Sequence, residues 1–291
     1  MINDIIKVII LSIVEGFTEF LPVSSTGHLI LVNEFVNLTP ENFSNAFNVI
    51  IQLGAIFAVI RQYFYKLNPL DLGKISYNTD MLGYEFLTTK EKLKFRISHF
   101  HKPTIRLWIK VIIGFIPAMV LGFLFDDIID AYLFRPEVVA GALIFWGIVI
   151  IVLEMMHKTE FKVNSISDLT PMQAIKIGFF QCLAMIPGTS RSAATIIGGM
   201  ATGANRTVSA EFSFFLAIPT MLGATALKIL KLGAVFTSAQ WGLILLGSVL
   251  AFLSADAVIN TFMKYIKNNS FIAFGIYRII LGTLVFVYIY H

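Results

Sequence analysis

Residues 15–28 read Glu15-Gly-Phe-Thr-Glu19-Phe-Leu-Pro-Val-Ser-Ser-Thr-Gly-His28, and this polar stretch interrupts a long apolar region. A second polar stretch, Pro187-Gly-Thr-Ser-Arg191-Ser192, interrupts apolar sequence in the same way. A charged side chain at the centre of a bilayer costs roughly 2.5–3.5 kcal/mol on insertion scales. Polar groups concentrated at these two points therefore indicate a functional site rather than a scaffold.

The composition is that of an integral membrane protein. Apolar residues make up 57% of the chain, charged residues 14%, and the mean hydropathy is +0.79. A soluble domain carries about 25% charged residues. The net charge of +4 gives no reason to expect nucleic acid binding, because the basic residues lie mainly between apolar runs. The single cysteine, Cys182, excludes a disulfide framework.

Long apolar runs predict the fold, since about 20 such residues cross a membrane as a helix. Six such runs are unbroken, whereas two other apolar regions, 5–36 and 172–205, are broken by the polar stretches. Backbone that leaves a helix at membrane depth is tolerated only inside protein or beside a wet cavity. We therefore predict an all-α integral membrane protein with two re-entrant helix pairs and about six full transmembrane helices. The six runs are 46–63, 104–125, 137–156, 210–230, 240–263 and 271–290.

The two halves of the chain resemble one another in the order of their elements. A shift of 165 residues places Pro22 on Pro187, Ser24 on Thr189 and Ser25 on Ser190. Each half then contains one broken pair followed by three spans, which gives the halves opposite orientations in the membrane. Such inverted-topology repeats form their sites near the midplane from discontinuous helices. We predict a single membrane domain over 1–291, with a first repeat over 1–156 and a second over 157–291.

The charges of the connections predict the orientation, because cytoplasmic loops are rich in lysine and arginine. The loop 64–103 is strongly basic and is expected in the cytoplasm. The next connection carries Asp126, Asp127 and Asp130 and is expected outside. The first polar stretch then enters from the external side and the second from the cytoplasmic side.

Glu15 and Glu19 are the first candidate site residues. They are four residues apart, so on a helix they share one face. Two carboxylates in a low dielectric repel one another unless one is protonated or a cation lies between them. A hard divalent ion, Mg²⁺ or Ca²⁺, prefers oxygen ligands of this kind. We predict that both residues bind such an ion; the alternative is a polar pair packed into the helix bundle.

Hydroxyl groups and a histidine follow the first carboxylates. Ser24, Ser25 and Thr26 offer contacts to an anion, although each could instead cap the next helix. His28 lies three residues after Ser25 and could exchange a proton with a nucleophile or leaving group. A lone histidine is more often structural, but its position beside Glu and Ser favours a catalytic role.

The second stretch is a short turn that opens a helix. Backbone N–H groups at a helix N-terminus bind anions, and an arginine adds two-pronged contacts to phosphate oxygens. No acidic residue lies near Arg191 in the sequence, so its expected partner is an anionic ligand; a simple capped turn is the alternative. Together the two stretches predict metal-assisted phosphoryl chemistry. The predicted binding residues here are Gly188, Thr189, Ser190, Arg191 and Ser192.

The two stretches resemble the signature motifs of the undecaprenyl-diphosphate phosphatase family, also called bacitracin resistance proteins. Residues 49–55, 211–214 and 276–278 are also similar to that family in order and spacing. The resemblance covers essentially the whole chain. It implies a bacterial plasma-membrane enzyme that removes the terminal phosphate of a C55 polyprenyl diphosphate and recycles the carrier lipid for peptidoglycan synthesis. It also implies a site open to the external leaflet.

Carried over by position, the resemblance gives catalytic roles to Glu19, Ser25, His28 and Arg191. Glu15 and Glu19 match the family's acidic pair, and Ser25 its proposed nucleophile. Ala193 stands where the family usually has glycine, which brings a methyl group close to the phosphate turn. The residues leave open a phosphoserine intermediate or direct attack by water. They also leave open a homodimer.

Two expectations remain. Asp256 and Arg278 lie inside apolar spans, and we expect them to pair within the bundle; contact between Arg278 and the lipid diphosphate is the alternative. A transporter or flippase for polyprenyl phosphates is the rival function, because inverted repeats with broken helices are a transporter architecture. A transporter has no need of a nucleophile, a base and a metal together, so the sequence favours the enzyme.

Overall fold

The computed structural model describes residues 2–76, 84–133, 135–156, 161–232 and 235–290. Within these ranges the chain consists of helices and connections, and its only ladder pairing is one isolated bridge between Val163 and Ala204. The predicted all-α class is confirmed. The acidic residues Asp126, Asp127 and Asp130, used to predict orientation, have side chains outside the described set.

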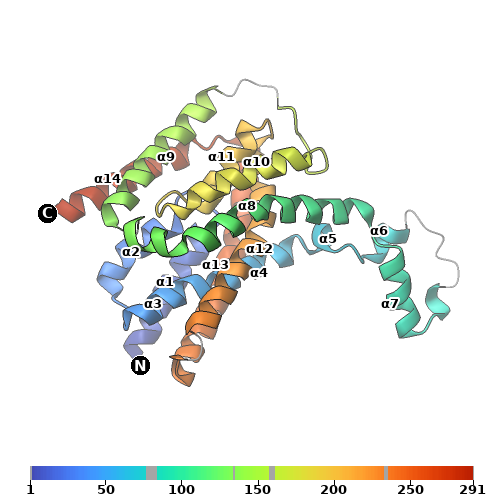
Figure 1. Cartoon of the computed structure of the whole chain (residues 1–291), viewed down its shortest axis with the longest axis horizontal. Coiled ribbons are helices and arrows are strands. Elements are labelled where there is room, and N and C mark those ends of the chain that lie inside the picture. Colours follow the sequence, from blue (N-terminus) through green and yellow to red (C-terminus); the bar gives the residue numbers. More distant parts are fainter. Residues whose placement is uncertain (1, 77–83, 134, 157–160, 233–234, 291) are drawn as a thin grey trace.

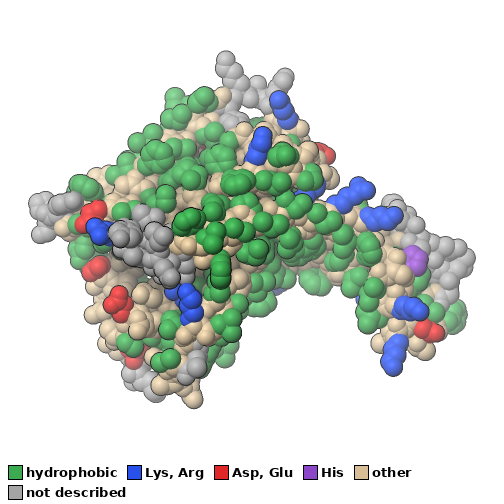
Figure 2. Space-filling model, in the orientation of Figure 1, with side chains coloured by type: hydrophobic (Ala, Val, Ile, Leu, Met, Phe, Trp, Pro, Cys, Tyr) green, Lys and Arg blue, Asp and Glu red, His purple; other side chains and the backbone are tan. Residues whose placement is uncertain are grey.

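Six helical stretches of the described chain are long and apolar enough to cross a membrane, and each overlaps one predicted run. The first is formed by α3 and α4, which meet at a break at Ile51. Hydrophobic side chains cover much of the visible surface (Figure 2). The protein is therefore a multi-pass membrane protein. The spanning helices are α3 (Glu41–Ile50) with α4 (Gln52–Gln62), α8 (Lys102–Leu133), α9 (Pro136–Met156), α12 (Arg206–Leu232), α13 (Ser238–Asn268) and α14 (Ile272–Tyr290).

Both polar stretches break their helices where the sequence predicts. Pro22 and Pro187 lie in the two breaks, because proline has no N–H to donate and cannot continue a helix. The helices on either side are shorter than the roughly 20 residues needed to cross a membrane. The first pair is α1 (Ile2–Thr18) and α2 (Ser25–Val36); the second is α10 (Pro171–Cys182), with the 3₁₀ turn η2 (Leu183–Met185), and α11 (Arg191–Ala201).

The two halves pack against one another reciprocally. Helix α1 lies along α13, α10 lies along α8, and the third spans α9 and α14 lie side by side (Figure 1). The first helix of each half thus contacts the second span of the other half. At one crossing a Cβ added to Gly178 would lie 2.2 Å from the carbonyl oxygen of Gly114, so only glycine allows this approach. This exchange is the packing expected of a two-fold repeat; its inversion across a bilayer stays a prediction.

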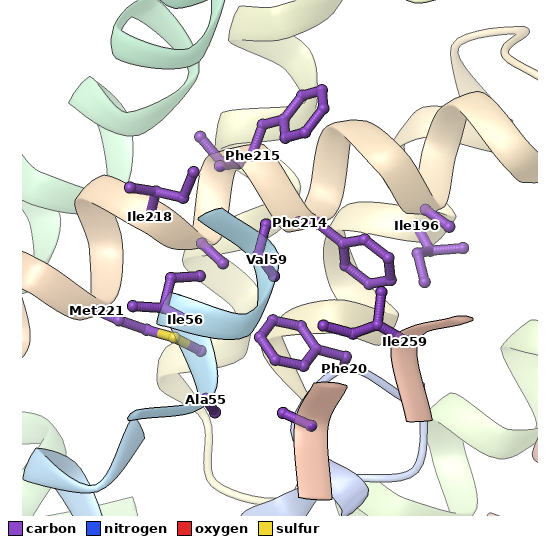
Figure 3. Packing of buried hydrophobic residues seen from close by; sticks show 14 of the residues in the cluster. Phe20, Ala55, Ile56, Val59, Ile196, Phe214, Phe215, Ile218, Met221 and Ile259 are labelled. Atoms are coloured by element: carbon purple, nitrogen blue, oxygen red, sulfur yellow. The ribbon is translucent and has the colours of Figure 1, made fainter. Parts of the chain in front are cut away.

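Buried aromatic and aliphatic side chains pack against the first break. Phe20 is fully buried and meets Phe214 of α12 edge to face, with ring centroids 5.3 Å apart. Figure 3 shows the Phe20 ring beside Phe214 and Ile259, with Val59 and Ile56 of α4 nearby. Among membrane-spanning helices, close van der Waals packing of this kind holds the elements together. The turn that follows Glu19 is therefore fixed to the spanning helices by packing.

The connection between α4 and α8 projects from the bundle as an arm (Figure 1). Lys74 and Trp108 fasten its base: the Lys74 ammonium donates to the Tyr65 carbonyl, and the Trp108 indole N–H donates to the Leu67 carbonyl over 2.8 Å. The arm contains α5 (Phe64–Leu67), α6 (Leu72–Ser76), the 3₁₀ turn η1 (Tyr84–Phe86) and α7 (Thr89–Ser98).

Candidate active site

The two broken segments have the same local geometry. Ser24 and Ser190 each precede a helix, each has a positive φ (72° and 73°), and each caps its helix through the side-chain oxygen. Ser24 accepts from the Gly27 N–H over 3.2 Å, and Ser190 from the Ala193 N–H over 3.3 Å. The caps are 166 residues apart, so the predicted register of 165 is wrong here. Ser25 corresponds to Arg191, because the second turn contains one more residue after its proline.

Contacts between the two turns hold them together. The Ser192 hydroxyl donates to the Leu21 carbonyl over 2.7 Å. The Arg278 guanidinium of α14 donates to the carbonyls of Pro22 (3.2 Å), Gly188 (2.7 Å) and Thr189 (3.0 Å). Arg278 is fully buried, so these hydrogen bonds replace its lost water. One side chain therefore fixes both turns.

The predicted pairing of Asp256 with Arg278 is wrong. Asp256 accepts from the Arg61 guanidinium and from the Gln62 amide, both at the end of α4. Arg61, an arginine from the first half of the chain, pairs with this carboxylate of the second half. Arg278 instead uses backbone carbonyls, which the sequence pattern does not reveal.

Glu19 is the centre of the site. Its Oε2 accepts from the Ser25 hydroxyl over 2.6 Å, and its Oε1 accepts from Arg191 Nη2 over 3.0 Å. Arg191 Nη1 also donates to the Ser213 carbonyl of α12 over 3.0 Å. The Glu19 and Ser25 side chains are almost fully buried. A hydroxyl, a carboxylate that accepts from it and a guanidinium that holds the carboxylate are thus in direct contact, as a nucleophile, its base and an orienting group would be.

The sequence predicts an anionic ligand as the partner of Arg191, but in the structure Arg191 pairs with Glu19, which lies 172 residues away in the sequence. No acidic residue lies near Arg191 along the chain. The fold brings Glu19 to it from the first half of the chain. Arg191 must release this carboxylate, or share its guanidinium, when it binds an anion.

Glu15 precedes Glu19 by one helical turn. It is fully buried beside Glu19, Gln52 and Arg191. Neither of its carboxylate oxygens has a hydrogen-bond partner among the described residues. A buried carboxylate without partners is costly unless it is protonated or meets a cation. Its two free oxygens next to Glu19 therefore fit the predicted divalent ion.

No group of three or more His, Cys, Asp or Glu side chains in the described ranges could hold an ion by itself. Glu15 and Glu19 would then supply only part of a coordination shell. Magnesium commonly keeps several waters and binds through one or two carboxylates together with substrate phosphates. The donor set suits an ion that binds together with a phosphate-containing ligand.

His28 lies apart from the carboxylate cluster. Its Nδ1 is 2.8 Å from the Ser24 carbonyl oxygen, and its Nε2 is 2.6 Å from the Tyr277 hydroxyl. The imidazole also stacks on the Tyr277 ring, with centroids 5.5 Å apart. Both ring nitrogens are therefore engaged by groups other than Ser25. The structure brings Glu19, not His28, to the hydroxyl of Ser25.

The remaining predicted residues line the two turns. Gly188 has φ +89°, and a Cβ there would lie 2.5 Å from the Val139 carbonyl oxygen, so glycine is required. Thr189 is fully buried, and its hydroxyl has no partner among the described residues. The hydroxyls of Ser190 and Ser192 are 2.9 Å apart. Thr26 is half-buried in the first turn of α2.

Ala193, which stands where the family usually has glycine, fits its position in the structure. It is fully buried in the first turn of α11, where its N–H donates to the Ser190 cap. A helical position accepts the extra methyl group. The turn over residues 187–190 is therefore undisturbed.

Comparison with known proteins identifies the family. The family model of the bacitracin resistance protein BacA matches residues 8–284. This chain belongs to that family.

Relatives within the BacA family match along nearly their whole length. The undecaprenyl-diphosphatase 1 of Clostridioides difficile is 50% identical over 288 residues, covering 99% of this chain and 97% of the relative. The undecaprenyl-diphosphatases of Fusobacterium nucleatum and Enterococcus faecalis are 49% and 44% identical, each covering 97% of this chain. They cover 100% and 96% of those relatives.

Proposed function

We propose that this protein is an undecaprenyl-diphosphatase. It hydrolyses undecaprenyl diphosphate to undecaprenyl phosphate and inorganic phosphate, which recycles the lipid carrier for cell-wall synthesis and accounts for the family's link to bacitracin resistance. The relatives support the substrate class. The observation that carries the chemistry is the contact of Glu19 with both Ser25 and Arg191.

The first step uses the Ser25 hydroxyl. Glu19 Oε2, already 2.6 Å away, takes its proton while Ser25 Oγ attacks the terminal phosphorus. The bond from that phosphorus to the bridging oxygen breaks, and undecaprenyl phosphate leaves with the bridging oxygen's electron pair. Water then attacks the phosphoserine, Ser25 Oγ leaves and regains a proton, and inorganic phosphate is released. In the direct alternative, Glu19 deprotonates water and Ser25 only orients it.

Arg191 supports the transferring group. Its guanidinium moves from Glu19 Oε1 to the phosphate oxygens and neutralises the charge that builds up in the transition state. The N–H groups at the starts of α2 and α11 offer further donors to the same anion. Ser24, Thr26, Gly188, Thr189, Ser190 and Ser192 line this pocket for the diphosphate.

Glu15 and Glu19 would hold a divalent cation, Mg²⁺ or Ca²⁺. When bound, such an ion neutralises charge on the diphosphate oxygens and so assists departure of the lipid phosphate. The unpartnered oxygens of Glu15 support this assignment. The site would open toward the external face of the bacterial plasma membrane, since the basic arm is expected on the cytoplasmic side.

Phosphate release from undecaprenyl diphosphate by the purified protein in detergent tests the proposal. Wild type should turn over, and Ser25→Ala, Glu19→Gln and Arg191→Ala should each lose at least about a hundredfold in kcat. Ser44→Ala is the matched control, because Ser44 is a buried serine of α3 outside the site. If wild type released no phosphate yet carried the lipid across vesicles, the protein would be a transporter.

Labelled phosphate separates the two hydrolytic routes. Rapid acid quench with terminally labelled substrate should leave label on the peptide that contains Ser25. Glu19→Gln should abolish this label together with turnover. Turnover without any label on Ser25 would assign the attack to water.

A further inference from the structure

Helix α7 presents an exposed apolar stripe flanked by basic residues. Leu93 and Ile97 are four residues apart on one face, and their side chains are 54% and 55% exposed. Phe86 and Phe100, just before and after α7, are exposed as well. None of the residues of α7 is buried. This stripe, made of Phe86, Leu93, Ile97 and Phe100, is called the arm stripe.

Basic side chains lie on both sides of the arm stripe. Lys90 and Lys94 each come three residues before a stripe residue and lie on one side of it. Lys92 and Arg96 each come one residue before a stripe residue, about 100° around the helix on the other side. In Figure 2 lysine and arginine side chains and hydrophobic ones both lie on the surface of the arm.

The opposite face of α7 is covered by its own arm, which fixes the stripe outward. Phe95 packs edge to face on the buried Tyr84, with ring centroids 5.3 Å apart, and stacks on His99 at 4.2 Å. Arg96 Nε donates to the Tyr84 hydroxyl over 2.9 Å. Thr88 caps the helix reciprocally with Glu91. The arm stripe is therefore a surface feature of an ordered element.

The ends of the arm place it at the membrane surface. It leaves the spanning helix α4 at Gln62 and re-enters the spanning helix α8 at Lys102. Its base is fastened to the start of α8, because the His101 N–H donates to the Pro69 carbonyl over 2.8 Å. Helix α7 runs across the direction of α8 (Figure 1), so a bilayer crossed by α8 has its surface alongside α7.

We propose that α7 docks on the anionic surface of the membrane that the protein spans. The arm stripe enters the boundary between headgroups and acyl chains, and the exposed Lys90 and Lys94 contact phosphate groups. An apolar face bordered by basic residues is the pattern of helices that lie in this interface. Clusters of four or more basic residues next to a span bind acidic lipids. The arm is thus a lipid-reading element separate from the catalytic turns.

Hydrogen exchange of the full-length protein in single-copy nanodiscs tests the docking. Discs of phosphatidylcholine are compared with discs that contain one third phosphatidylglycerol. Amides of residues 89–98 should exchange at least about tenfold more slowly in the anionic discs. Lys90→Gln/Lys94→Gln should remove most of this difference, whereas the control Lys264→Gln/Lys267→Gln, at the end of α13, should keep it. Equal exchange in both lipids, or a response that survives the first variant, would overturn the proposal.

Depth measurement separates docking from a general effect of charge. A spin label on Ile97→Cys in a Cys182→Ser background should become accessible to oxygen and protected from a water-soluble nickel chelate. A label at Ser98→Cys, an exposed residue on the side of α7 away from Leu93, should stay accessible to the chelate. Equal chelate access at both positions would contradict insertion of the stripe. Protection found only in discs with two copies would assign the stripe to a dimer contact instead.

Discussion

Ser25 and Arg191 are each the first residue of their helix, and they bind the two oxygens of the same carboxylate, Glu19. The equivalent positions of the two halves thus carry different groups that act on one target. The two turns have matching geometry, and their different side chains suit the attack and the anion binding that we propose. In the structure Arg191 pairs with Glu19, and in the proposed mechanism a phosphate takes the place of this carboxylate on Arg191.

Arg191→Lys should lower kcat by about a hundredfold or more. The planar guanidinium spans the Ser213 carbonyl and Glu19 at once, whereas an ammonium group makes only point contacts. Initial rates of phosphate release measure the change. Arg61→Lys, in an exposed pair with Asp256, should stay within about twofold of wild type. Near-normal kcat in Arg191→Lys would mean that the fork geometry is unimportant.

Glu15→Gln should raise the Mg²⁺ or Ca²⁺ concentration for half-maximal activity by at least about tenfold. It should not lower the thermal stability of the metal-free protein, because the amide removes an unpartnered buried carboxylate. Calorimetric titration with each ion gives a readout independent of turnover. Chelation should abolish wild-type activity, and added ion should restore it. The control is Glu41→Gln, an exposed residue of α3. Unchanged ion affinity in Glu15→Gln would remove it from the metal site.

Features that depend only on residues close together in the sequence could be predicted from it. The breaks at Pro22 and Pro187, the six spans and the capping serines follow from hydropathy, proline chemistry and hydroxyl positions. The closeness of Ser25 to Glu19 could be expected from six residues of separation. These features need no knowledge of the partner half.

Contacts across the two halves could not be predicted in the same way. Arg191 reaches Glu19 over 172 positions, and His28 reaches Tyr277 over 249. A single sequence states which polar groups are in the membrane but not which of them meet. Arg278 shows this limit well: its partners are backbone carbonyls, which carry no side-chain signal. Asp256 was therefore the wrong partner to expect.

His28→Gln and Tyr277→Phe should have similar, modest effects on kcat, each within about tenfold. The imidazole is bonded to Tyr277 and to the Ser24 carbonyl, so its role is to position the start of α2. The double variant should be no worse than the single ones, because the two side chains act as one unit. The pH dependence of kcat should be unchanged in both. Loss of about a hundredfold or more in His28→Gln alone, with a shifted pH profile, would restore His28 as the general base.

The arm should lose order as the pH falls. Thr88 donates its hydroxyl (2.7 Å) and its N–H (2.8 Å) to Glu91, which holds the pKa of that carboxyl below its usual range. A carboxyl with a depressed folded-state pKa stabilises the helix above its unfolded pKa, near about 4.3. The contribution is lost as the pH falls from there through the lower folded pKa. Exchange of the α7 amides should therefore quicken in acid beyond its intrinsic pH dependence, and Thr88→Ala should weaken that response. An identical response in Thr88→Ala would show that the cap does not control α7.

Arg278→Met should destabilise the protein by at least about 3 kcal/mol, because hydrogen bonds to a charged group contribute about 1.5–3 kcal/mol each. The substitution leaves the carbonyls of Pro22, Gly188 and Thr189 buried without their donor. Arg278→Lys should recover part of the loss. Denaturant unfolding in detergent measures stability, and kinetics should show a fall in kcat with KM little changed, since the two turns lose their relative position. If KM rose while stability stayed at the wild-type value, Arg278 would bind the lipid diphosphate directly rather than hold the turns.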